Sequence, residues 1–177
     1  MKKYILFLFS ILISTITIYA QSPEQKLQKL GITLPVPAKP VANYVNAVRT
    51  GNLIYLAGQG PKNADGTNIT GKVGKDLTIE QAYAAARLVG INQLAVLKAE
   101  LGSLDKVKRI VKVFGMVNCT GDFTDQPKVI NGFSDLMVEV FGEENGKHAR
   151  AAVGMYMLPF NISVEVEMIV EVYPDKK

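Results

Sequence analysis

Near its end the chain carries a run, residues 164–172, in which apolar and charged side chains alternate. A period of two is typical of a β-strand that buries one face, because successive side chains of a strand point to opposite sides of the sheet. The even-numbered positions are all apolar, whereas Glu165, Glu167 and Glu171 lie on the other side. The run therefore predicts a sheet that packs one face against helices and leaves a second face of different character.

Two upstream segments are predicted to supply the helices. Thr78 and Gln81 form a capping box, so a helix is expected from there to Leu101, ending at Gly102. A second helix is expected from Pro127 to Phe141. Apolar residues recur at helical spacing in both, at Ala82, Ala86, Val89, Leu94, Leu97 and Leu101 in the first and at Ile130, Phe133, Met137, Val140 and Phe141 in the second. Two helices are enough to cover one face of a sheet.

The remaining β-type runs complete a single α+β domain. Residues 44–50 and 53–58 are predicted to form a hairpin that turns at Gly51 and Asn52, a pair suited to positive φ angles. Strands are also expected at 108–117, 149–157 and 162–173, the last two separated by a Leu158–Pro159 corner. The predicted order is β-β-α-β-α-β-β, a mixed sheet with two helices on one face.

The first twenty residues are predicted to be a signal peptide. Lys2 and Lys3 precede an apolar stretch that ends at Ala20, followed by polar residues. A membrane anchor is the alternative, but spanning a bilayer takes about 20 apolar residues, and serines and threonines dilute this stretch. Cleavage after Ala20 would leave a periplasmic or secreted protein beginning at or near Gln21, which N-terminal sequencing of the native protein would show.

The mature chain is expected to have a polar, proline-rich lead-in at 21–40 and one domain at 41–175. Ser22 and Pro23 favour a short helix at the start of the lead-in. The formal net charge of +4 falls to +2 without Lys2 and Lys3, too little to indicate nucleic-acid binding by itself. Cys119 is the only cysteine, so it can form no intramolecular disulfide, and we expect a small buried side chain there. With one Cys and one His, neither a metal site nor a cofactor is expected.

The two C-terminal strands suggest where charged residues gather. If they are neighbours, and if the apolar set Ala151, Val153, Met155 and Met157 meets the helices, then Arg150 and Glu165 project together from the opposite, uncovered face. One interpretation is a surface ion pair worth about 0–1 kcal/mol. The other is a polar-lined subunit interface, favoured because Ala152, Gly154, Tyr156 and Ile169 would share that face.

Several short motifs, in order, resemble the RidA (YjgF) family. They are Ala42-Asn43-Tyr44, Gly51-Asn52-Leu53-Ile54, Ala57-Gly58-Gln59, Asn131, Ala149-Arg150-Ala151-Ala152-Val153, Leu158-Pro159 and Val164-Glu165-Val166-Glu167. The resemblance implies a chorismate-mutase-like fold assembled as a homotrimer around a central barrel, with sites in clefts between subunits. It also implies hydrolytic deamination of small enamines and imines, such as 2-aminoacrylate, to 2-keto acids and ammonia.

The resemblance assigns roles to single residues. Arg150 would pair with a substrate carboxylate, which suits its planar fork of donors. Glu165 would orient or activate the attacking water, and Tyr44 would hydrogen-bond the substrate at the pocket mouth. Ala57, Gly58, Asn131 and Ala152 would line the substrate site.

This chain departs from the family pattern at two of those positions. Ala152 stands where many members carry Cys, and Ala57 where many carry Ser, so substrate choice can differ. His148 takes a position where Pro is common, and we expect it to be a surface residue without a partner.

Two alternative functions remain open. The same cleft would also serve a non-catalytic module that binds a small carboxylic acid. An endoribonuclease activity is allowed by the resemblance, but clustered basic and aromatic residues are missing from the sequence.

Overall fold

The computed structural model describes residues 21–175. The predicted signal peptide therefore lies outside the described residues. The helices are α1 (Pro23–Lys29), α2 (Ile79–Leu101), α3 (Gln126–Phe141) and α4 (Glu143–Gly146), with short 3-10 turns η1 (Leu104–Lys106) and η2 (Pro159–Asn161). The strands are β1 (Ala47–Thr50), β2 (Leu53–Gln59), β3 (Val107–Asn118), β4 (Ala149–Met155) and β5 (Val164–Val172). The predicted order of strands and long helices is confirmed.

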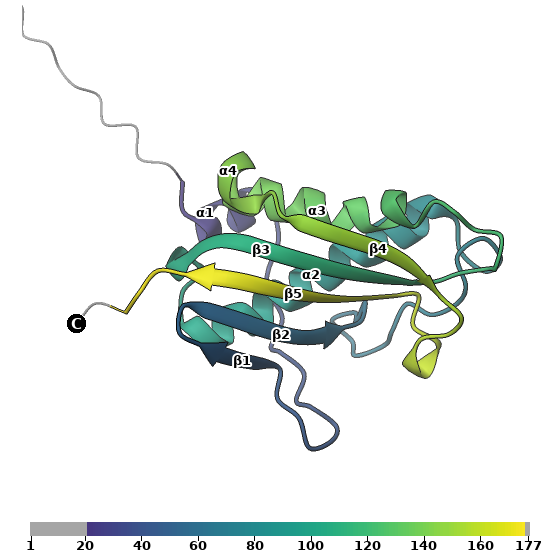
Figure 1. The fold of residues 1–177 in the computed structure, drawn as a ribbon, viewed down its shortest axis with the longest axis horizontal. Helices are drawn as coiled ribbons and strands as arrows, with labels where there is room; N and C mark the ends of the chain where they lie inside the picture. The colour runs from purple at the N-terminus through teal and green to yellow at the C-terminus, as the bar shows by residue number, and fades with distance from the viewer. Residues whose placement is uncertain (1–20, 176–177) are drawn as a thin grey trace, which may run out of the picture.

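The strands form one mixed sheet in the order β1-β2-β5-β3-β4. All neighbours are antiparallel except β3 and β4, which run parallel. A parallel pair needs a crossover connection, and α3 provides it, as Figure 1 shows. Strand β4, which carries Arg150, is the last strand in this order and lies at the edge of the sheet, alongside α3.

Helices α2 and α3 cover one face of the sheet, and the other face is uncovered (Figure 1). We call the uncovered face of the sheet the open face. The apolar residues of β5 at even positions are all buried under the helices, as the alternation predicted. Each apolar stripe predicted for α2 and α3 is buried too.

Local sequence signals account for the boundaries of α2. The Thr78 hydroxyl accepts from the Gln81 amide at 3.2 Å, and the Gln81 side chain accepts from the Thr78 amide at 2.9 Å. At the other end Gly102 adopts a φ of 78°, a left-handed conformation that suits glycine. Among residues 21–175, no helix combines the length and apolar character needed to cross a bilayer.

The lead-in packs on the domain. Ser22 caps α1 as predicted, and Leu27 of this helix joins the main hydrophobic core. Glu24 accepts from the Leu104 amide at 2.9 Å, which ties α1 to η1. The helix before the predicted domain thus contributes to its core.

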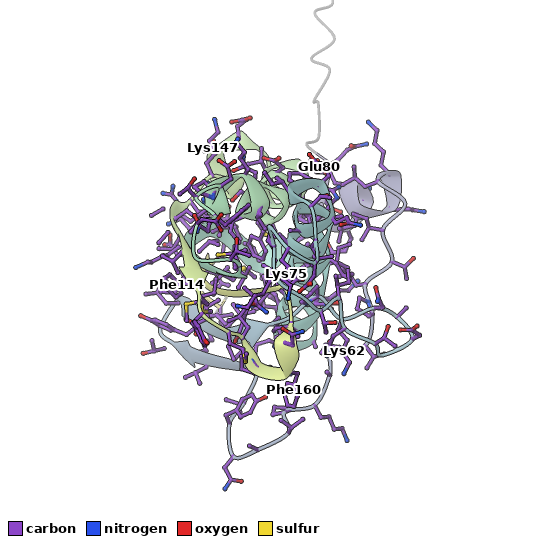
Figure 2. All side chains as sticks on the ribbon, turned by 90° about the vertical axis from the view of Figure 1, so that its right-hand side faces the viewer. Lys62, Lys75, Glu80, Phe114, Lys147 and Phe160 are labelled. Carbon is purple, nitrogen blue, oxygen red and sulfur yellow. The ribbon has the colours of Figure 1, made fainter. Side chains whose placement is uncertain are left out.

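The corner between β4 and β5 presents apolar side chains to solvent. Tyr156 is 91% exposed and Phe160 is 80% exposed, and Figure 2 shows Phe160 at the tip of the corner. Phe160 and Asn161 both adopt positive φ angles, 56° and 55°. Consecutive non-glycine residues in this region store backbone strain of about 1–3 kcal/mol each.

Candidate functional site

Arg150 is the second residue of the edge strand β4, and its side chain reaches over to helix α3. Its Nη1 donates to the side-chain oxygen of Asn131 at 2.9 Å and to the hydroxyl of Ser134 at 3.0 Å. Within residues 21–175 no carboxylate forms an ion pair with Arg150. The guanidinium is exposed and keeps its positive charge available for an external anion.

Arg150 and Glu165 do not project from the same face, so that expectation is wrong. Arg150 stands in register with Val113 of β3, which is buried beneath the helices. Glu165 stands in register with Met116, three residues further along β3 and therefore on the open face. Strand β3 also separates β4 from β5, so the two strands are not neighbours.

The reason is the close approach of α3 to the edge strand. The side of β4 beneath the helices carries small residues, and a Cβ added to Gly154 would meet Gln126 Nε2 at 2.8 Å and Cys119 Sγ at 2.9 Å. Ala152 packs on the main core on that side. The larger Val153 and Met155 pack instead with Met116 on the open face, the reverse of the predicted arrangement.

Glu165 lies directly against the backbone of Gly58. A Cβ added to Gly58 would come within 2.1 Å of the Glu165 carboxyl oxygen. The pairing of β2 with β5 is interrupted by a bulge between Leu56 and Gln59, which places Ala57 and Gly58 at this point. The three predicted site residues Ala57, Gly58 and Glu165 are thus brought together.

The environment of Glu165 favours its protonated form. Partial burial raises the pKa of this carboxyl, and the negative charge of Glu167 raises it further. A carboxyl with a raised pKa exchanges protons closer to neutral pH, as general acids and bases require.

Sequence reasoning missed Gln93, a fully buried residue of α2. Its Nε2 donates to the carbonyl oxygen of Ala57 at 2.9 Å and to that of Val166 at 2.7 Å. These carbonyls adjoin Gly58 and Glu165, so Gln93 bridges the two strands where their pairing is interrupted. The available signal was its place four residues after Val89 and four before Leu97, inside an apolar stripe.

Within residues 21–175, Tyr44 forms no hydrogen bond to Arg150 or Glu165. It is 51% exposed and belongs to the loop that leads into β1 and projects from the sheet in Figure 1. The next residue, Val45, lines a hollow of about 470 Å³ on the open face, together with Tyr55, Phe114 and Glu167. Figure 2 shows Phe114 on this side of the molecule.

His148 is not a surface residue without a partner, so that expectation is also wrong. Its ring lies 2.7 Å from the Gly146 carbonyl through Nδ1 and 3.1 Å from the Ser134 hydroxyl through Nε2. Cys119 is buried as predicted. Among residues 21–175 no group of His, Cys, Asp and Glu is arranged to hold a metal ion.

Comparison with known proteins places this architecture in a family. Residues 24–172 match the family described as "YjgF/chorismate mutase-like, putative endoribonuclease". The chain is 48% identical over 145 residues to protein TCP17 of Trypanosoma cruzi, covering 82% of this chain and 91% of that protein. It is 33% identical over 141 residues to a 2-iminobutanoate/2-iminopropanoate deaminase of Dermatophagoides farinae, covering 78% and 93%.

A solved structure agrees with these matches. Atu1372, a protein of unknown function from Agrobacterium tumefaciens, is 46% identical, with a TM-score of 0.78 over 85% of this chain and 94% of that one. The shared elements include the five-stranded mixed sheet and its covering helices. This chain therefore belongs to the YjgF/RidA family of chorismate-mutase-like proteins.

Proposed function

We propose that this protein hydrolyses small carboxylate-bearing imines and enamines, of the 2-aminoacrylate type, to 2-keto acids and ammonia. The observation that carries the proposal is the exposed Arg150 guanidinium, which is held by neutral oxygens and paired with no carboxylate in the described chain. A relative with 33% identity is named a 2-iminobutanoate/2-iminopropanoate deaminase. The chemistry needs an anchor for the carboxylate and a group that handles protons near the C=N carbon.

Glu165 is the proposed proton-handling group. Water adds to the imine carbon and gives up a proton to the Glu165 carboxylate, and the carboxyl passes that proton to the imine nitrogen, so the product is a neutral tetrahedral amino alcohol. The carboxylate then takes the hydroxyl proton and passes it to the amino group, the C–N bond breaks with its electron pair leaving on ammonia, and the C–O bond becomes the keto C=O. An enamine first tautomerises to the imine, so the reaction consumes one water and releases one ammonia.

A site that uses both Arg150 and Glu165 requires two copies of the chain. The two residues lie on opposite faces of the sheet in one copy, on strands that β3 separates. We propose that the open face of one subunit meets the β4 edge of the next in a homotrimer. The carboxylate anchor and the proton-handling carboxyl would then face each other across a cleft, with Tyr44 at its margin.

The first experiment tests the carboxylate anchor. Hydrogen bonds to charged groups contribute roughly 1.5–3 kcal/mol each, so Arg150→Ala should lower both the affinity for 2-oxobutanoate and the turnover of imines made in situ by an amino-acid oxidase. Arg150→Lys should not restore them, because an ammonium group lacks the planar fork. Arg87→Lys, on the outer surface of α2 where Arg87 pairs with Glu139, is the matched control and should behave like the parent.

The second experiment separates binding from chemistry. Glu165→Gln keeps the shape but removes the basic oxygen, so turnover should fall by about 10²–10⁴-fold while 2-oxobutanoate still binds. If Arg150→Ala binds and reacts like the parent, the proposed site is wrong. A parent protein that binds keto acids without accelerating hydrolysis would instead be a carboxylate-binding module.

The family description supports a second candidate, an endoribonuclease. Incubation of the protein with single-stranded and double-stranded RNA tests this directly. Cleavage that survives purification and disappears in Arg150→Ala or Glu165→Gln would move the assignment to RNA.

A further inference from the structure

The contacts of Arg150 divide its five N–H donors into two groups. Both Nη1 hydrogens are occupied, one by Asn131 and one by Ser134. Within residues 21–175, Nε and Nη2 donate to no protein acceptor. Nε–H and one Nη2–H point in parallel, and this edge of the guanidinium matches the two oxygens of a carboxylate.

Ser134 is itself held by a second residue. The Gly146 carbonyl, 2.7 Å from His148 Nδ1, can only accept, so Nδ1 carries the hydrogen of the neutral ring. His148 Nε2 is then an acceptor, and the Ser134 hydroxyl 3.1 Å away donates its one hydrogen to it. That leaves the oxygen lone pairs of Ser134 directed at Arg150.

We propose that Ser134 and His148 are positioning residues that hold the Arg150 guanidinium through a hydrogen-bond chain and commit its Nε–Nη2 edge to the substrate carboxylate. This inference rests on the proposed function and deepens it. The hydrogen-bond chain runs from the Gly146 carbonyl through His148 and Ser134 to Arg150 Nη1. The Asn131 side-chain oxygen accepts the other Nη1 hydrogen. Each acceptor is neutral, so the positive charge of Arg150 is not cancelled.

The surroundings of His148 favour the neutral form of its ring. Burial lowers the pKa of His148 and so does the charge of Arg150, while the Gly146 carbonyl opposes this by raising the pKa. Lys147, Arg109 and Glu171 line the same hollow as His148, and Glu171 is paired with Lys108 at 2.8 Å.

Ligand binding tests the positioning role. Ser134→Ala should weaken 2-oxobutanoate binding about tenfold, the low end for one hydrogen bond to a charged group. His148→Leu should weaken it about threefold, whereas His148→Gln, which keeps an acceptor near the Nε2 position, should bind like the parent. The turnover number at saturating imine should change little, because Glu165 is supplied from elsewhere. Ser103→Ala is the control, because the Ser103 hydroxyl caps η1 and is distant from Arg150 in the sequence.

An NMR titration tests the chain without a ligand. His148 is the only histidine of the sequence, so its imidazole signals in tag-free protein report on one site. Its pKa should rise in Arg150→Gln, because a neighbouring cation is removed, and in Ser134→Ala, because neutral Nε2 loses its donor. Arg87→Gln should leave it unchanged.

These experiments distinguish a failure of the hydrogen-bond chain or the positioning role from a failure of the proposed function. A His148 pKa that is the same in the parent and in Arg150→Gln would overturn the hydrogen-bond chain. Tight binding by Ser134→Ala would overturn the positioning role while leaving the proposed function intact. A parent that binds no keto acid overturns the proposed function, even if the titration shows the chain.

Discussion

At Gly58 a single hydrogen lies between the backbone and the Glu165 carboxyl. A methyl group there would come within 2.1 Å of the carboxyl oxygen and 2.9 Å of its carbon. Gly58→Ala should therefore displace the carboxyl and lower imine turnover, and a misplacement of about 1 Å can cost about 10²-fold. Keto-acid binding at Arg150 should persist.

A matched substitution distinguishes displacement of the Glu165 carboxyl from a general effect of replacing a glycine by alanine. Gly121 has open space where its Cβ would be, and its φ is not positive. Gly121→Ala should leave turnover at the parent value. Equal losses in both variants would show that Gly58 has no special relation to Glu165.

The raised pKa of Glu165 predicts a pH-dependent stability. Its folded pKa lies above its ordinary value because of burial and Glu167, so the folded protein retains the proton that the unfolded chain releases. Stability is therefore lost as pH rises from the ordinary carboxyl pKa through the raised one. Glu165→Gln should unfold at a higher temperature than the parent at neutral pH, and the two should converge in acid.

Thermal denaturation over a range of pH measures this difference. Glu167→Gln removes a neighbouring charge and should give a smaller gain of the same sign. A parent that is more stable than Glu165→Gln at neutral pH would mean that the ionised carboxylate is stabilised in the fold.

At the scale of elements, α2 and α3 touch backbone to backbone. A Cβ added to Gly132 of α3 would lie 2.1 Å from the carbonyl oxygen of Tyr83 and 3.2 Å from the amide nitrogen of Arg87. The Tyr83 hydroxyl donates to Asp135 at 2.7 Å beside this contact. Glycine is required here by the close approach of the two helices.

Gly132→Ala should separate the helices and destabilise the fold, by about 1–3 kcal/mol as for other overpacked interiors. Chemical denaturation measures the loss against the parent and Gly121→Ala. An unfolding midpoint equal to that of the parent would show that α2 and α3 can move apart without cost.

Element prediction from the sequence succeeded where the signal is local. The capping pair Thr78 and Gln81 fixed the start of α2, and the alternation in β5 identified its buried side. Which side chains of β4 point toward the helices could not be predicted, because this depends on how closely α3 approaches Gly154. The insertion of β5 between β2 and β3 depends on long-range pairing, which no local pattern encodes.

At the scale of the whole molecule, the open face predicts self-association. Val48 and Tyr55 are 55% and 44% exposed on it, and Ile169 stands between Tyr55 and Lys112. Apolar side chains gathered on one uncovered face are typical of subunit interfaces. Light scattering on protein that begins at Gln21 should give three times the subunit mass, if the open face forms the proposed homotrimer.

Ile169→Lys tests the same face by placing a second cation opposite Lys112. It should release folded monomers that have lost imine turnover, because the proposed site is formed by two subunits. Lys98→Gln, on α2 away from the open face, should remain trimeric. A parent that is monomeric yet active would show that the site is complete within one chain.

The strand order has a consequence for biogenesis. β5 is made last, yet it occupies the centre of the sheet, between the β1–β2 hairpin and the β3–β4 pair. These halves cannot join until β5 has emerged from the ribosome, so the core stays unclosed while the first four strands are made. A truncation before Val164 should split the sheet rather than trim its edge.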